Sequence, residues 1–272
     1  GQNFGNIDDR SSAEMAMQVY NSASAQFQSD SGNRLLPLPL MPAWDVDKCV
    51  AEAKRCAAMG MRGINMTSEP SDIGGHDLGE RVWDRFWETC TDLQLPVHFH
   101  IGASVTAATF HSTYTWKSHT VDSKLAMGGA MQFIGNAAVA MNFVMSGIFD
   151  RHPDLKIVSV ESGAGWVPFA MEAIEYELME NAPDDLKKMK KLPMEYFRDN
   201  MYATFWFERN LGHLQMLVDT VGEDNILFET DYPHPTCLYP APLDIIADKM
   251  ATITPQAQRK IMGENGRKLY RL

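Results

Sequence analysis

The chain has 272 residues, and its 24 lysines and arginines against 35 aspartates and glutamates give a formal net charge of −11. This acidity argues against a nucleic-acid or an anionic-membrane partner, because either would require a basic surface. Hydrophobic residues make up 45% of the chain and charged residues 22%, a balance that excludes global disorder. The longest mostly apolar stretch, residues 137–149, is shorter than the ~18 residues that a membrane span needs.

We predict a single domain over residues 1–272, in which residues 1–33 form a leader and an N-terminal helix. The helical pattern covers Ser11–Gln28, and no signal peptide precedes it. The four cysteines include no CxxC pair. We expect Cys49, Cys56 and Cys90 to be buried and reduced, while the role of Cys237 stays open. A cytoplasmic location is therefore expected.

Apolar runs follow along the chain and alternate with helical patterns. Strands are predicted at Leu35–Met41, Met61–Met66, Pro96–Ile101, Lys156–Glu161, Met201–Phe205 and Ile226–Thr230. Their starts lie 26, 35, 60, 45 and 25 residues apart. This is the size of strand–helix units rather than of hairpins, and it implies a parallel sheet.

Three of the helices between these strands have clear signals. Asp45 is expected to cap a helix that ends at Gly60. Apolar residues at helical spacing over 82–93 predict the next helix, which Pro96 closes. A third helix is predicted at about Ala126–Phe149.

Six consecutive strand–helix units predict an α/β fold of the (β/α)8 TIM-barrel type, with two units unaccounted for. The segment before the first predicted strand has a helical pattern. Either a strand lies hidden in the first residues, or the chain lacks the first two strands of the barrel. We expect a barrel that is incomplete at its N-terminus.

Polar side chains stand at the ends of three predicted strands: His98 and His100, then Glu161, then Asp231. The two histidines are two residues apart on a strand and so share a face. Chemistry in such barrels takes place at the C-terminal ends of the strands. Imidazole and carboxylate groups bind divalent metals, and a carboxylate can take a proton from metal-bound water. One histidine near a strand end would by itself be interpreted as a buried core residue with its hydrogen bonds satisfied. The polar groups at three strand ends together favour a metal or acid–base site.

Other catalytic motifs are absent from the sequence. It contains no HExxH, GxSxG or GxxxxGK[ST] pattern and no GxGxxG after a strand. Ser162 has Val160 rather than glycine two residues before it, so a serine-hydrolase elbow is disfavoured. No lysine stands at these strand ends, which favours a site with one metal ion.

Three blocks of sequence together resemble the amidohydrolase-2 family, the group related to aminocarboxymuconate-semialdehyde decarboxylase. They are LPVHFHIG (95–102), FDRHPDLKIVSVESGAGWVPF (149–169) and ILFETDYPHP (226–235). The resemblance implies a barrel of the metal-dependent hydrolase type with one divalent ion. It implies His100 as the metal-ligand histidine of the fifth strand and Asp231 as the carboxylate close to the metal and its water. Zinc is the expected metal and manganese the next.

The sequence departs from this family at two points. The family begins with an HxH pair on its first strand, and residues 1–33 contain none. We therefore expect a chain truncated at its N-terminus that lacks two metal ligands. Decarboxylases of the family have a catalytic histidine at the end of the sixth strand, where this chain has Glu161. A carboxylate at this place can act as a base or bind a ligand, but not as a cationic acid.

These observations favour a metal-dependent hydrolase that acts on a small, aromatic or carboxylate-bearing substrate. Asp231 would take a proton from metal-bound water, and Glu161 would orient substrate or water. The alternative on the same scaffold is a non-oxidative decarboxylase. An alternative of another class is a metal-free, inactive fragment or binding remnant.

Further residues are candidates for contacts with substrate or with the metal ligands: His98, His234, His111 and Trp116. His111 and Trp116 lie in a segment whose aromatic residues would suit a flat substrate or, equally, a packed surface loop. His234 can also serve only to fix its turn. The resemblance implies a homodimer, and we expect a small molecule as the other partner.

Overall fold

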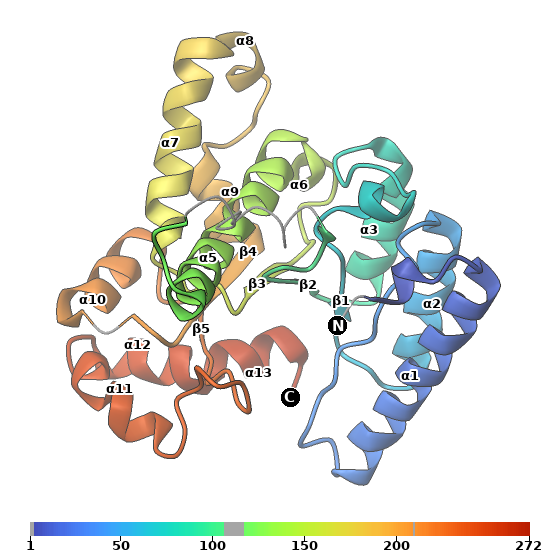
Figure 1. The fold of residues 1–272 in the computed structure, drawn as a ribbon. Helices are drawn as coiled ribbons and strands as arrows, with labels where there is room; N and C mark the ends of the chain where they lie inside the picture. Colours follow the sequence, from blue (N-terminus) through green and yellow to red (C-terminus); the bar gives the residue numbers. More distant parts are fainter. Residues whose placement is uncertain (1–2, 106–116, 209) are drawn as a thin grey trace. The chain divides into compact units, whose positions relative to one another are not determined.

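The structure is a computed structural model that describes residues 3–105, 117–208 and 210–272. It divides into two compact units, Gly1–Ile157 and Val158–Leu272, and Figure 1 labels the elements. The elements before the boundary are η1 (Asn3–Asn6), α1 (Arg10–Asp30), α2 (Val46–Ala58), β1 (Ile64–Asn65), η2 (Pro70–Ile73), η3 (Arg81–Trp83), α3 (Asp84–Asp92), β2 (Val97–His100), α5 (Val121–Met145) and α6 (Ile148–Arg151). Strand β3 (Ile157–Val160) crosses the boundary, and after it come α7 (Trp166–Asn181), α8 (Pro183–Leu186), α9 (Pro193–Asn200), β4 (Met201–Phe205), α10 (Leu211–Thr220), β5 (Ile226–Phe228), α11 (Pro242–Met250), α12 (Pro255–Arg259), η5 (Lys260–Glu264, a π-helix) and α13 (Asn265–Tyr270).

The strands follow one another in chain order, β1-β2-β3-β4-β5. The pairs with a described register, β1 with β2 and β4 with β5, are parallel. This confirms the predicted α/β class with a parallel sheet. The described residues include no helix that is both long and apolar enough to cross a membrane.

The first predicted strand, over 35–41, is wrong. Only Leu40 pairs there, in an isolated parallel bridge with Asn65. Pro37 and Pro39 lie within this run and have no backbone N–H, so they cannot donate to a strand ladder. The described residues before it form η1 and α1 and contain no hidden strand.

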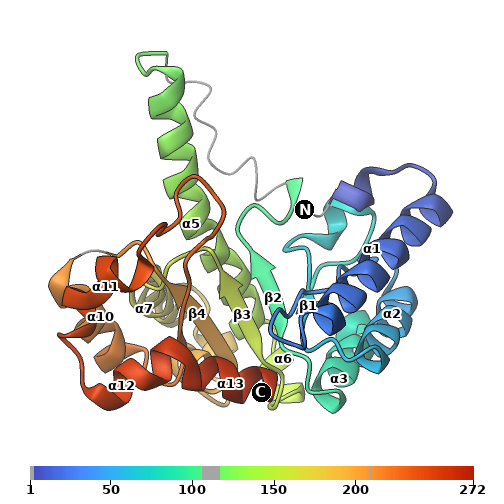
Figure 2. The same ribbon diagram turned by 90° about the horizontal axis from the view of Figure 1, so that it is seen from below.

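The first unit packs α1 against α2, which lie side by side in Figure 2. The buried side chain of Asn21 in α1 links the two helices to the extended chain at Leu40. Its Nδ2 donates to the carbonyl oxygen of Leu40 (2.9 Å) and to Glu52 Oε1 (2.7 Å), and its Oδ1 accepts the N–H of Leu40 (2.9 Å). Asp45 caps α2 as predicted, accepting the N–H of Lys48.

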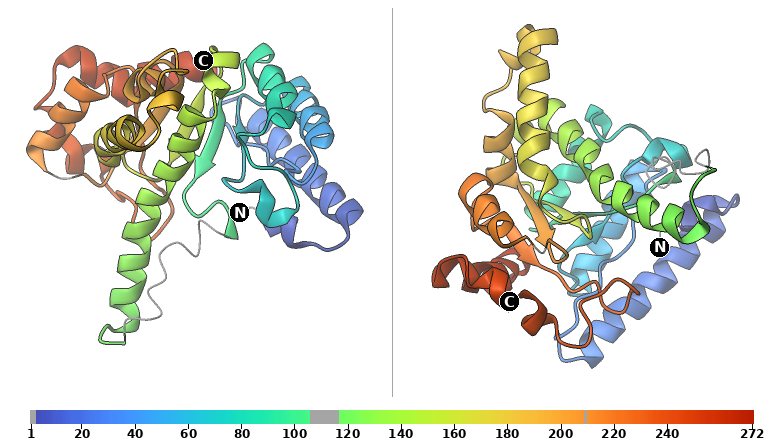
Figure 3. Two further views of the ribbon diagram at one scale, coloured as in Figure 1. Left: turned by 90° about the horizontal axis from the view of Figure 1, so that it is seen from above. Right: turned by 60° about the vertical axis from the view of Figure 1, so that its left-hand side comes forward.

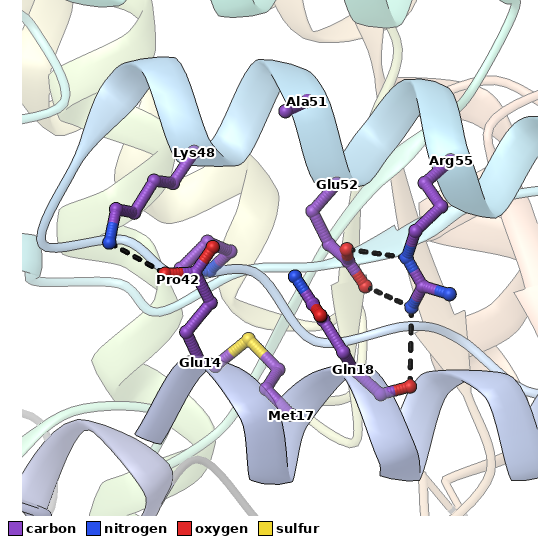
Figure 4. A pocket seen from close by; sticks show the side chains of 8 residues that line it. All are labelled: Glu14, Met17, Gln18, Pro42, Lys48, Ala51, Glu52 and Arg55. Carbon is purple, nitrogen blue, oxygen red and sulfur yellow. Dashed lines mark hydrogen bonds and ion pairs between the residues drawn. The ribbon is translucent and has the colours of Figure 1, made fainter. Parts of the chain in front are cut away.

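Figure 4 shows the small cavity between these two helices, with a volume of about 80 Å³. Its walls are Glu14, Met17, Gln18, Pro42, Lys48, Ala51, Glu52 and Arg55. Lys48 pairs with Glu14 at 2.6 Å, and Arg55 pairs with Glu52 at 2.7 Å. The ion pairs cross-link α1 with α2 and brace α2 itself, so the cavity belongs to the packing of the helices.

An aromatic cluster forms much of the core of the first unit and supports β2. Phe143 of α5 packs its ring on Trp87, Phe99 and Phe149, with ring centroids 5.4 to 5.7 Å apart. Asn136 of α5 also donates to the carbonyl oxygen of Phe99 (2.9 Å). The helix predicted at 126–149 is two helices, because Gly147 takes a left-handed conformation (φ 71°) between α5 and α6.

In the second unit, α7 packs along α9 and bears α8 at its C-terminal end (Figure 3). Helix α9 leads without a gap into β4, whose predicted bounds are confirmed. Two buried asparagines tie this strand region together. Asn225 donates to the carbonyl oxygens of Arg198 and Met201, and Asn265 donates to those of Glu223 and Ile226.

Candidate active site

Two carboxylates follow strands of the second unit, as predicted, and both have an unusual backbone. Glu161 comes directly after β3, and Asp231 comes three residues after the end of β5. Their φ angles are +59° and +58°, in the left-handed region. This conformation costs a non-glycine residue about 1 kcal/mol or more and is concentrated at functional sites.

Glu161, Asp231 and His234 form a group whose potential ligand atoms all lie within 4.8 Å of one another. The side chain of Asp231 is 8% exposed and that of His234 is 58% exposed. The Thr236 hydroxyl donates to Asp231 Oδ2 (2.9 Å) and lies 3.0 Å from His234 Nδ1. One threonine thus orients both the carboxylate and the imidazole.

A third carboxylate, Glu229, lies beside this group. Its Oε2 accepts the backbone N–H of Glu161 at 3.1 Å. Burial raises the pKa of Glu229 to about 7, against the effect of hydrogen bonds from Thr204 and Glu161. The charges of Glu161 and Asp231 contribute to this raised pKa. The sequence analysis missed Glu229 because it lies inside the predicted strand over 226–230, whereas the observed strand β5 ends at Phe228.

The donors of this group fit a divalent cation. Two carboxylates and an imidazole converge from two strand ends, Glu161 after β3 and Asp231 with His234 after β5, and the carboxylates carry like charges that a cation would neutralise. Such a mixed oxygen and nitrogen set suits several first-row divalent metals.

The two predicted histidines of β2 belong to the first unit and differ from each other. His98 is buried, and its Nδ1 lies 2.9 Å from the carbonyl oxygen of Ile64. His100 is exposed at the end of the strand, with Nδ1 2.7 Å from the carbonyl oxygen of Ile101. This contact favours a proton on Nδ1 of His100, so Nε2 is the nitrogen that would bind a metal. The predicted residues His111 and Trp116 lie outside the described residues.

His98 makes the stability of the protein depend on pH. Burial lowers its pKa from 6.5 to about 4, so the unfolded chain takes up a proton near pH 6.5 that the folded chain takes up only near pH 4. The free energy of unfolding therefore falls as the pH falls through this window. We expect a loss of about 2 kcal/mol between pH 7 and pH 5.

Urea unfolding in the presence of a chelator measures this loss. His98→Gln should remove about 2 kcal/mol of the difference between pH 7 and pH 5. His76→Gln is the control, because the His76 side chain is 55% exposed. Equal pH dependence in wild type and His98→Gln would contradict a buried neutral histidine.

Comparison with known proteins places this chain in a family. A family model described as amidohydrolase matches residues 6–272. A gamma-resorcylate decarboxylase from Polaromonas sp. (strain JS666 / ATCC BAA-500) is 26% identical over 250 residues, which are 89% of this chain and 70% of that protein. A 2-amino-3-carboxymuconate-6-semialdehyde decarboxylase from Dictyostelium discoideum is 26% identical, over 80% of this chain and 56% of that protein.

Solved structures share the fold. An amidohydrolase from Mycobacterium avium subsp. paratuberculosis K-10 matches with a TM-score of 0.76 at 22% identity, over 96% of this chain and 65% of that chain. A dihydroxybenzoic acid decarboxylase from Polaromonas sp. JS666, with bound manganese, matches with a TM-score of 0.74 at 22% identity, over 98% of this chain and 78% of that chain. The fold is of the (β/α)8 type, and because the family model covers nearly all of the sequence, the chain belongs to the amidohydrolase-2 family of enzymes.

Proposed function

We propose that this chain is a non-oxidative decarboxylase of a small aromatic or unsaturated acid. The observation that carries the proposal is the convergence of Glu161, Asp231 and His234 within 4.8 Å at strand ends. Relatives named as decarboxylases, at 26% identity, favour this reaction over the hydrolysis that the sequence analysis put first. Hydrolysis has the support of the family description alone.

A divalent metal ion fits the donor set of this site. Glu161, Asp231 and His234 would hold it, and when bound it would supply a Lewis acid for the substrate carboxylate and an adjacent oxygen. Manganese is the first ion to test, because a solved relative contains it. Zinc, the metal expected from the sequence, has no such support. The predicted ligand His100 stays a prediction.

The chain's own residues would handle the proton. Decarboxylation breaks the bond between the carboxylate carbon and its neighbour, CO₂ leaves, and the electron pair left behind takes a proton at carbon. We assign the delivery of that proton to Asp231, whose carboxylate would take it from water and pass it to the carbon while the Thr236 hydroxyl donates to Oδ2. Glu161, 9% exposed, would hold the substrate or its metal in place.

The test is CO₂ release from a panel of phenolic and unsaturated acids by the metal-loaded chain. We expect release with Mn²⁺, a loss of at least about 100-fold after chelation, and recovery when Mn²⁺ is added back. Zn²⁺ and Mg²⁺ serve as comparison ions. Hydrolysis of esters or amides without CO₂ release from any acid would support the hydrolase instead. A chain that binds no metal and has neither activity would support the binding remnant.

The predicted homodimer and cytoplasmic location stay predictions. Light scattering on the eluted peak of a sizing column gives the molar mass and therefore tests the dimer directly. A mass of one chain, 30.5 kDa, would contradict it.

A further inference from the structure

The loop between β3 and α7 is fastened at both ends by carboxylates from two other strand ends. At its start, the N–H of Glu161 donates to Glu229, which follows β5. At its end, the N–H groups of Ala164 and Gly165 donate to Oε1 of Glu208, at 2.6 and 3.1 Å. Glu208 lies three residues after β4. The loop that presents Glu161 is thus bonded to the two strand ends that follow it in the chain.

Glu208 replaces the missing cap of α7. The N-cap residue of this helix is Gly165, which has no side chain to cap it. The Glu208 side chain is buried (5% exposed), and its Oε2 also accepts the N–H of Trp206 at 3.3 Å. A carboxylate at the N-terminus of a 16-residue helix is stabilised by backbone N–H groups and by the helix dipole.

The two glycines of this loop allow the backbone to come this close. Gly163 has a φ of +65°, and a Cβ there would lie 2.6 Å from Glu208 Oε1 and 2.7 Å from the Phe207 ring. A Cβ on Gly165 would lie 2.7 Å from the His213 ring. A side chain at either position would push the loop away from its neighbours. Gly163 therefore leaves room for the Glu208 carboxylate, and Gly165 leaves room for the His213 ring.

We propose that Glu208 and Glu229 are positioning residues that hold the loop so that the Glu161 carboxylate stays close to Asp231 and His234. Glu161 has a left-handed backbone that a free loop would relax. Its N–H is anchored by Glu229, and the chain three residues later is anchored by Glu208. The inference deepens the proposed function and rests on the same site, but the fastening itself exists without metal or substrate.

The first experiment follows amide hydrogen exchange in the full chain without metal. Glu208→Gln keeps the volume of the side chain and one acceptor oxygen but loses the charge. We expect the amides of Ala164 and Gly165 to exchange at least ten times faster in this variant. Glu229→Gln should instead speed exchange at Glu161. The matched control is Glu195→Gln, because Glu195 accepts the N–H of Leu192 at the start of α9 (2.7 Å), away from this loop.

The second readout is the affinity for Mn²⁺, followed by electron paramagnetic resonance. Both loop variants should bind Mn²⁺ about 10 to 100 times more weakly than wild type, as expected for partners that orient ligands. Glu195→Gln should leave the affinity unchanged. Lower thermal stability with unchanged exchange in the loop and unchanged Mn²⁺ affinity would overturn the proposal. If wild type binds no Mn²⁺, the proposed function fails, while the exchange experiment still decides whether the carboxylates fasten the loop.

Discussion

Replacing Asp231 by asparagine is expected to lower kcat/KM for decarboxylation by about 10² to 10⁴-fold, the usual contribution of a positioned proton donor. The amide keeps an oxygen that can accept the Thr236 hydroxyl, so the turn after β5 should persist. It cannot carry the proton that the substrate carbon must receive. Initial rates of CO₂ release, measured at saturating Mn²⁺, check the expected loss.

The control for this variant is Asp248→Asn, which removes the charge of an exposed aspartate in α11. It should keep the wild-type rate, and both variants should unfold at similar temperatures. Metal content separates two causes of a slow Asp231→Asn enzyme. A full complement of Mn²⁺ with a low kcat points to the proton, whereas an empty site points to ligation. An Asp231→Asn chain that is loaded with Mn²⁺ and turns over at the wild-type rate would remove Asp231 from the mechanism.

The fold could be predicted where local signals agree with the final packing. The sequence predicts strand β4 with its observed bounds, because an apolar run follows directly on a helix. Asp45 was predicted as the cap of α2 for the same local reason. The run over 35–41 is apolar but contains prolines, and the N–H groups of Leu35 and Leu40 donate to side chains rather than to a strand. Leu40, for instance, is bonded to the side chain of Asn21, a contact that no local pattern reveals.

The candidate site could be predicted only in its outline. Carboxylates after parallel strands are expected at one edge, and Glu161 and Asp231 do meet there. The sequence predicts His234 as a residue that contacts substrate or the metal ligands, or as a turn residue, whereas its ring lies among the possible ligand atoms themselves. Glu208 and Glu229 were missed because their contacts are with backbone N–H groups of a distant loop. Such bonds leave no spacing in the sequence, since any acceptor of suitable length could make them.

The largest expected effect on stability concerns Asn21 and the packing of α1 on α2. Asn21→Ala removes three buried hydrogen bonds, two with the backbone of Leu40 and one with the carboxylate of Glu52. The polar groups left behind have no water beside them, because Asn21 is fully buried and Leu40 is 5% exposed. At about 1 kcal/mol for each bond, and more for a partner left unsatisfied, we expect a loss of about 3 kcal/mol.

Urea unfolding followed by circular dichroism measures this loss, with Gln26→Ala as the matched control. Gln26 lies on the exposed side of the same helix, where it donates to Asp30 one turn later (2.7 Å), and its removal should change the free energy of unfolding by no more than about 0.5 kcal/mol. Glu52 retains its bonds to Arg55 in the Asn21 variant, so its charge stays paired. The cost therefore falls mainly on the Leu40 backbone. If Asn21→Ala unfolds at the same urea concentration as Gln26→Ala, the asparagine does not hold the two helices to the chain at Leu40.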